Sequence, residues 1–118
     1  MEDALQRADA YVDAGADGIM IHSRRSTTDE VFQFAESFRR SHPHCPLVCV
    51  PTSFAAAQFD ELQSAGFNVV IYANHMLRAA YVAMQQVASD ILRHGRTFEL
   101  ERQCMGINDL LALIPGTR

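Results

Sequence analysis

Lysine is absent from the 118-residue sequence, so all 10 of its basic residues other than histidine are arginine. Chemistry that depends on a lysine side chain is therefore excluded within these residues. The 14 acidic residues outnumber the basic ones, and the chain lacks the concentrated basic face with which proteins displace counterions from nucleic acids. No apolar run approaches the roughly 20 residues of a membrane-spanning helix. We therefore expect neither a nucleic acid nor a membrane as a partner.

Cysteine is scarce, because only Cys45, Cys49 and Cys104 are present. An odd number of cysteines, with no hydrophobic targeting segment ahead of them, is typical of free thiols in a reducing compartment. We therefore expect a cytoplasmic protein.

Several chemical signatures are also missing from the sequence. There is no glycine-rich phosphate loop, no Gly-x-Ser-x-Gly turn, and no carboxylate cage suited to Mg²⁺. Four potential metal ligands do fall close together, but zinc sites usually pair two well-spaced couples of ligands. These four lie before and within one predicted strand, at the end opposite the expected site: His42, His44, Cys45 and Cys49. We expect no metal site among them.

The length and the 48% content of apolar residues are typical of one domain with a real core. Along the chain, the apolar residues switch repeatedly between helical and extended spacing. The pattern predicts strands over residues 18–22, 46–50 and 68–72, and helices over 2–14, around 31–38, and over 59–65, 75–94 and 109–114. Because helices separate the strands, the strands must be parallel. Their unbroken apolar character indicates that both faces are covered.

A sheet of three parallel strands leaves long apolar edges unpaired. The pattern therefore indicates either part of a larger structure or a small open α/β sheet. We expect a hydroxyl among residues 26–28 to cap the helix that follows, and Asn108 to cap the last helix. The helix over residues 75–94 is expected to bury one apolar face, which includes Leu77, Tyr81, Met84 and Leu92.

Polar residues follow each predicted strand directly, where parallel α/β proteins bind their ligands. The chain reads His22-Ser23-Arg24-Arg25 after the first strand, Thr52 after the second, and Asn74-His75 after the third. Arginine, histidine and serine side chains together suit an anion such as a phosphate or a carboxylate. Because loops are commonly polar, simple solvation is the alternative explanation for each of these side chains.

Three stretches of the sequence carry recognisable motifs: residues 2–23 with their Ala-Gly-Ala-Asp-Gly and Ile-His-Ser segments, Val50-Pro51-Thr52, and residues 70–79 with their Tyr-Ala-Asn-His-Met-Leu-Arg-Ala segment. Taken together, these stretches resemble the phosphoenolpyruvate mutase family. The resemblance covers nearly the whole chain. It implies the C-terminal part of a (β/α)8 barrel of the isocitrate lyase superfamily, with the sixth to eighth strands and the terminal helices. On this basis residues 1–95 are the later βα units, and residues 96–118 are a tail and helix open to exchange between subunits.

The resemblance implies an enzyme of phosphonate metabolism, an isomerase that interconverts phosphoenolpyruvate and phosphonopyruvate with the help of Mg²⁺. His22 aligns with a family histidine that holds the phosphoryl end of the substrate. Ser23 and Arg24 are further candidates for binding this small anionic substrate. Four other residues are expected at the rim or in structural roles: Thr52, Asn74, His75 and Arg78.

In the family, the nucleophile and the Mg²⁺ ligands lie on earlier strands, which this sequence does not contain. We therefore expect a fragment that is inactive alone. We also expect a homo-oligomer, in which the apolar helix with Leu110 and Leu113 contacts a partner or else packs on its own chain. Two alternatives stay open. Phosphonopyruvate hydrolase and the carbon–carbon lyases of the superfamily share this half, and a truncated chain could instead act without catalysis, through association.

Overall fold

A computed structural model of the protein describes residues 1–114 and 116. The chain divides into two compact units, Met1–Ala73 and Asn74–Arg118. No helix in the described part of the chain is long and apolar enough to cross a membrane.

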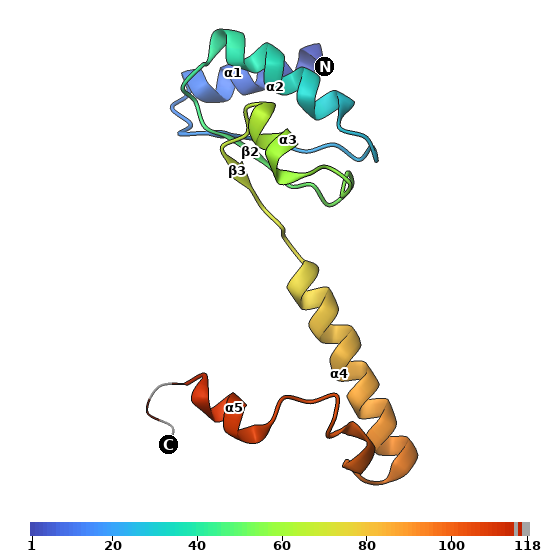
Figure 1. Cartoon of the computed structure of the whole chain (residues 1–118). Coiled ribbons are helices and arrows are strands. Elements are labelled where there is room, and N and C mark those ends of the chain that lie inside the picture. Colours follow the sequence, from blue (N-terminus) through green and yellow to red (C-terminus); the bar gives the residue numbers. More distant parts are fainter. Residues whose placement is uncertain (115, 117–118) are drawn as a thin grey trace. The chain divides into compact units, whose positions relative to one another are not determined.

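The first unit alternates helices and strands in the predicted order (Figure 1). Its helices are α1, Glu2–Asp13; α2, Asp29–Ser41; and α3, Phe59–Ser64, and its strands are β1, Ile19–Ile21; β2, Leu47–Cys49; and β3, Val69–Val70. The strands form one parallel sheet in the order β1-β2-β3. The prediction of three parallel strands joined through helices is thus confirmed, with each strand shorter than its apolar run.

One face of the sheet is covered and the other is open. Successive strand residues point to opposite faces, so register partners share a face. Ile19 and its partner Leu47 are buried on the covered face. Met20, Val48 and Val69 are register partners in one row on the other face, where Met20 is 62% exposed. The expectation of cover on both faces is therefore wrong for the first unit taken by itself.

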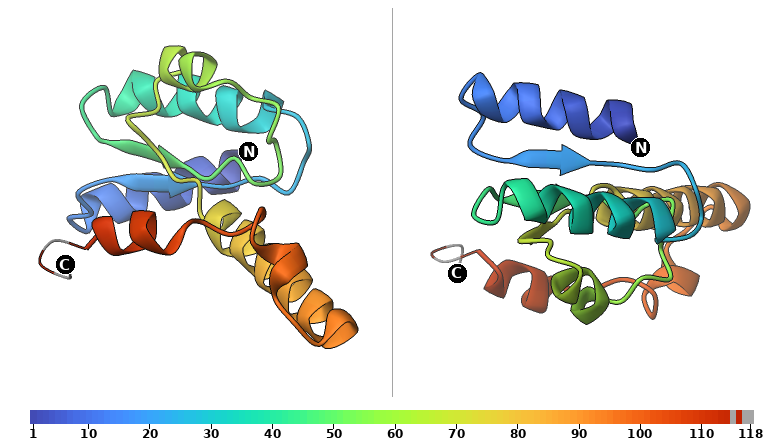
Figure 2. Two further views of the ribbon diagram at one scale, coloured as in Figure 1. Left: turned by 60° about the horizontal axis from the view of Figure 1, so that its bottom comes forward. Right: turned by 90° about the horizontal axis from the view of Figure 1, so that it is seen from above.

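The covered face is the one on which the helices lie. α1 and α2 are on the same side of the sheet (Figure 1), and both run antiparallel to β1 (Figure 2, right view). α2 supplies the centre of the core, because Val31, Phe34, Ala35 and Phe38 are all buried at the predicted helical spacing. The rings of Phe34 and Phe38 stack with their centroids 5.6 Å apart.

The guanidinium group of Arg39, near the end of α2, connects the segments that lead into β2 and β3. Its Nε and Nη2 donate to the carbonyl of Gly66 at 3.1 and 2.6 Å, and Nη1 donates to the carbonyl of Cys45 at 2.5 Å. Nη2 also donates to Asn68 Oδ1 at 2.5 Å, and the same oxygen accepts the backbone N–H of Leu47 at 2.9 Å. These contacts fix the amino ends of the two strands and leave the carboxyl ends to carry a site.

The second unit contains α4, His75–His94; the 3₁₀ helix η1, Phe98–Leu100; and α5, Ile107–Ala112. α4 has the predicted bounds and ends at Gly95, whose φ of +65° is left-handed. η1 packs against α4, and the two buried residues of this unit among those described are Asp90 and Leu100.

Three predictions about the helices are wrong. The expected inner face of α4 is exposed, with Leu77 at 70% and Leu92 at 86%, because η1 covers only part of the helix within its unit. α5 begins two residues earlier than predicted and is capped by Gly106 rather than Asn108. Thr28 precedes α2, but its hydroxyl makes no capping hydrogen bond. The physical reason is that its φ and ψ, −86° and −7°, are already helical, whereas a capping side chain needs extended backbone.

Candidate functional site

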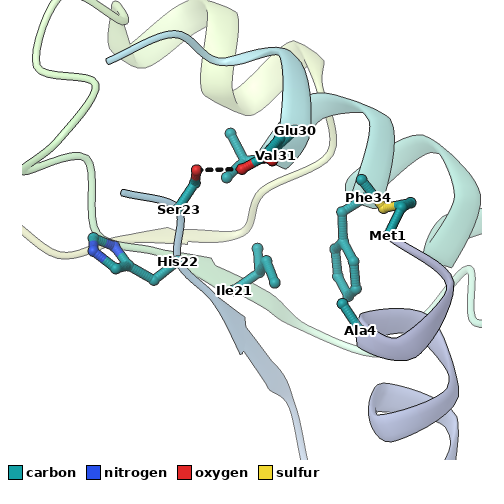
Figure 3. A pocket seen from close by; sticks show the side chains of 8 residues that line it. All are labelled: Met1, Ala4, Ile21, His22, Ser23, Glu30, Val31 and Phe34. Carbon is teal, nitrogen blue, oxygen red and sulfur yellow. Dashed lines mark hydrogen bonds between the residues drawn. The ribbon is translucent and has the colours of Figure 1, made fainter. Parts of the chain in front are cut away.

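Two consecutive residues at the carboxyl end of β1 point to opposite sides of the sheet. His22 is exposed and, two residues after Met20, points to the same open face of the sheet. Ser23 is 6% exposed and, two residues after Ile21, points to the face that the helices cover. Figure 3 shows the ring of His22 and the side chain of Ile21 on opposite sides of the chain. His22 therefore stands where a ligand at the open face would meet it.

The segment that follows β2 fixes the ring of His22. Its Nδ1 lies 3.2 Å from the carbonyl oxygen of Val50, which also accepts the backbone N–H of Thr52 at 2.9 Å. A carbonyl oxygen can only accept, so Nδ1 carries a proton and Nε2 is left for a ligand. Nε2 is an acceptor in the neutral ring and a cationic donor in the protonated one. Two residues of the predicted site, the His22 ring and the Thr52 backbone, thus share one acceptor, the Val50 carbonyl.

The hydroxyl of Ser23 is engaged within its own loop. It donates to Glu30 Oε2 at 2.6 Å and accepts the backbone N–H of Arg25 at 3.1 Å. The Nε of Arg25 lies 2.8 Å from Glu30 Oε1. The Ser23 hydrogen bond, followed by the charge of Arg25, holds the pKa of the Glu30 carboxyl below its ordinary value. Contact between Ser23 and a substrate stays a prediction.

The two neighbouring arginines differ in their surroundings. Arg25 is paired with Glu30. Arg24 is exposed and makes no ion pair with any residue that the structure describes. The charge of Arg24 is therefore available to an incoming anion, whereas most of the charge of Arg25 is already balanced.

A cavity of about 130 Å³ lies beside the end of β1 (Figure 3). Its polar wall faces an apolar one, and it is lined by Met1, Ala4, Ile21, His22, Ser23, Glu30, Val31 and Phe34. Ligand pockets usually measure about 300–1,000 Å³, which makes this cavity small for a substrate. The open face at His22 is the better candidate for binding.

Three other predicted residues belong to the second unit. Asn74 precedes α4, and its carbonyl accepts the backbone N–H of Arg78 at 3.0 Å. His75 is the first residue of α4. The Oδ1 of Asn74 is buried, with no hydrogen-bond partner among residues 1–114 and 116. Rim or structural roles for these three residues stay a prediction.

The residues that the structure describes do not fit a magnesium site. Among them, no three histidine, cysteine, aspartate or glutamate side chains gather as metal ligands would. Mg²⁺ prefers oxygen ligands, usually carboxylates with several waters. Glu30, the carboxylate in contact with the loop after β1, has both oxygens engaged by Ser23 and Arg25. Ligands for Mg²⁺ would have to come from elsewhere.

Sequence reasoning missed two groups that shape this site. Glu30 reads from the sequence as one of two acids in the first turn of a helix, where any acid is stabilised by the helix dipole. Nothing in the sequence marks it as the one that reaches back to Ser23. Val50 acts through its backbone carbonyl, which leaves no signal in a sequence at all.

Three parallel strands with helices on one face, and polar residues at the strands' carboxyl ends, define the later part of a (β/α)8-barrel fold. A family model described as phosphoenolpyruvate phosphomutase matches residues 1–92. The chain therefore belongs to the phosphoenolpyruvate phosphomutase family, as its motifs predicted.

Similar proteins agree with this assignment. The phosphoenolpyruvate phosphomutase of Streptomyces viridochromogenes is 35% identical over 114 residues, which cover 97% of this chain and 36% of that protein. The crystal structure of the phosphoenolpyruvate phosphomutase from Streptomyces platensis subsp. rosaceus superposes with a TM-score of 0.86 at 37% identity, covering 95% of this chain and 38% of that one. A phosphonopyruvate hydrolase structure in complex with oxalate and Mg²⁺ has a TM-score of 0.84 at 34% identity, with coverages of 95% and 39%. The chain thus spans between one third and two fifths of the length of these relatives.

Proposed function

We propose that this chain supplies the phosphoryl-binding edge of an enzyme that interconverts phosphoenolpyruvate and phosphonopyruvate. The observation that carries the proposal is the placement of His22 in a chain of the phosphomutase family. Its ring stands at the carboxyl end of a parallel strand, with Nδ1 held by the Val50 carbonyl, which leaves Nε2 to interact with a ligand. Active sites of (β/α)8 barrels lie at this end of the strands.

The reaction moves a phosphoryl group between carbon 3 and the enol oxygen of a pyruvyl unit. A carbon–phosphorus bond breaks and an oxygen–phosphorus bond forms, or the reverse, and no atom is gained or lost. Protonated His22 offers an Nε2–H donor to the phosphoryl oxygens, a charge-assisted hydrogen bond of the strong kind. Arg24 adds a second positive charge beside the same end of the substrate.

The other parts of this function are proposed to come from beyond the described residues. The Mg²⁺ that the family resemblance implies is supported by the likeness to a hydrolase structure that contains it, and it would polarise the pyruvyl oxygens. A homo-oligomer, a division at residue 95 with an exchanged tail, and a cytoplasmic location stay predictions. The three free cysteines, Cys45, Cys49 and Cys104, support the last of these.

Hydrolysis of phosphonopyruvate is the second candidate. It is supported by the TM-score of 0.84 with the hydrolase, close to the value of 0.86 with the phosphomutase. In that reaction water accepts the phosphoryl group, and the products are pyruvate and inorganic phosphate. The edge at His22 would bind the same end of the same molecule in both reactions. The carbon–carbon lyase and non-enzymatic alternatives stay predictions.

Titration of the ¹⁵N-labelled chain with phosphonopyruvate, followed by ¹H–¹⁵N NMR, tests the proposal. We expect amide shifts that concentrate at residues 22–25 and at Val50 and Thr52, because His22 joins these two segments. The shifts should be lost in His22→Gln and kept in His44→Gln, which changes an exposed histidine before β2. Pyruvate, which lacks the phosphorus group, is the ligand control. Shifts that are equal with pyruvate, or that avoid both segments, contradict the proposal.

A further inference from the structure

Glu30 connects both halves of the loop that begins at His22. It is the second residue of α2 and is half-buried. Its Oε2 accepts the Ser23 hydroxyl at 2.6 Å, and its Oε1 lies 2.8 Å from Arg25 Nε. The backbone N–H of Arg25 donates in turn to Ser23 Oγ at 3.1 Å. Glu30, Ser23 and Arg25 thus form a closed set of contacts on the side of the chain opposite the His22 imidazole. We name these three residues the Glu30 clamp.

We propose that Glu30 is a positioning residue, which holds the loop so that His22 and Arg24 are presented to an anion at the open face of the sheet. The inference rests on the proposed function, because it requires an anion at His22. Glu30 itself carries a negative charge and lies on the side of the helices, so it acts through its neighbours rather than by touching the anion. Neither the family match nor the sequence motifs assign it this role.

Burial of Ser23 explains why the loop depends on Glu30. Ser23 is 6% exposed, so its hydroxyl has little access to water. A buried hydroxyl without a partner keeps its full desolvation penalty, and the chain would move to relieve it. Glu30 accepts this hydroxyl and thereby fixes the residue directly after His22. His22 is thus held directly by the Val50 carbonyl at its ring, and indirectly by the Glu30 clamp, which fixes the neighbouring Ser23 and Arg25.

The clamp also decides which of the two arginines is available. The Glu30 carboxylate balances the charge of Arg25. Arg24 has no ion-pair partner in the described chain and keeps its charge for a ligand. The Ser23 hydrogen bond first, and then the charge of Arg25, lower the pKa of Glu30, so its carboxylate stays ionised to a lower pH than that of an unperturbed glutamate. The clamp is therefore complete above the ordinary pKa of a glutamate and is lost only as the pH falls through the lowered value.

A matched pair of substitutions separates positioning from simple electrostatics. Glu30→Gln and Asp29→Asn each remove one negative charge from the first turn of α2. Asp29 accepts the Thr27 hydroxyl at 3.0 Å, outside the clamp. If nearby charge alone mattered, both variants would bind an anion more tightly than the wild type. Positioning predicts the opposite sign for Glu30→Gln. We expect Glu30→Gln to bind phosphonopyruvate about tenfold more weakly, because a change of this size corresponds to the loss of one charge-assisted contact.

The measurement is the affinity of the 118-residue chain for phosphonopyruvate by NMR titration, together with hydrogen exchange of the Arg25 amide without ligand. We expect faster exchange of that amide in Glu30→Gln, unchanged exchange in Asp29→Asn, and an intermediate affinity in Glu30→Asp, which keeps the charge on a shorter side chain.

Either of two results overturns the role of Glu30: Glu30→Gln binds as tightly as Asp29→Asn, or it keeps the Arg25 amide protected. A wild-type chain that keeps this amide protected yet shows no binding at residues 22–25 overturns the proposed function instead.

Discussion

Replacing Arg39 by methionine should destabilise the first unit strongly. The guanidinium group donates to the carbonyls of Gly66 and Cys45 and to Asn68 Oδ1, all at 3.1 Å or less. A hydrogen bond to a charged group contributes about 1.5–3 kcal/mol, so three acceptors at the lower limit amount to about 4.5 kcal/mol. Arg39 is half-buried, and water replaces part of what is lost. We therefore expect a loss of about 3 kcal/mol in the free energy of unfolding.

The assay is urea unfolding followed by circular dichroism, with Arg40→Met as the control on the same helix. Arg40 makes an exposed ion pair with Glu36, and such pairs contribute about 0–1 kcal/mol. At a urea dependence of about 1–3 kcal/mol per molar, Arg39→Met should lower the midpoint by about 1–3 M, while Arg40→Met leaves it nearly unchanged. Arg39→Lys keeps the charge without the forked geometry and should fall between the two. Equal midpoints for Arg39→Met and Arg40→Met would refute the reasoning.

The remaining predictions concern glycine and cysteine. Gly66 and Gly15 have φ near +97° and +96°, so alanine at either costs about 1–2 kcal/mol of backbone strain. Gly66→Ala should cost more in urea unfolding, because its Cβ would lie 3.2 Å from Arg39 Nε whereas Gly15 has open space; equal costs would contradict this contact. Iodoacetamide should label the exposed Cys104 in the folded chain and the buried Cys49 only after unfolding, as mass spectrometry of the fragments can show. Burial raises the pKa of Cys49 from 9.0 to about 11. The Cys49 thiol therefore loses its proton at a lower pH in the unfolded chain than in the folded one. The free energy of unfolding should fall as the pH rises from 9.0 to about 11, and this decrease should be absent in Cys49→Ala.

The first unit could be predicted from the sequence because local patterns and tertiary packing agree there. The apolar stripe of Val31, Phe34 and Phe38 is the stripe that α2 buries. Gly66 ends its helix with a positive φ, as a glycine after a helix commonly does.

The second unit was harder to predict because its apolar residues have few partners within it. The spacing along residues 75–94 correctly indicates a helix, but Leu77 and Leu92 are exposed in the structure. Periodicity shows which residues share a face of a helix, and only a neighbouring element decides whether that face is buried.

The location of the candidate site could be predicted from the sequence, but the hydrogen-bond partners of its residues could not. The alternation along β1 already places His22 on the face opposite Ile21 and Ser23. Its partner Val50 is 28 residues away and acts through a backbone carbonyl, so no side-chain pattern reveals it. Glu30 and Asp29 look alike in the sequence, and only the path of the loop selects Glu30 as the partner of Ser23.

The central claim is that the edge at His22 serves phosphoryl transfer between carbon and oxygen. Its most direct test transplants this chain into the Streptomyces viridochromogenes phosphoenolpyruvate phosphomutase, in place of the segment that aligns with it. ³¹P NMR then follows phosphonopyruvate in the presence of Mg²⁺. We predict that the chimeric enzyme converts phosphonopyruvate to phosphoenolpyruvate. The rate of conversion should fall about 100-fold or more in His22→Gln, as when an enzyme loses a hydrogen-bond donor to a charged transition state, and it should persist in His44→Gln. Equal conversion with and without the His22 side chain, or inorganic phosphate as the sole phosphorus product, would contradict the account.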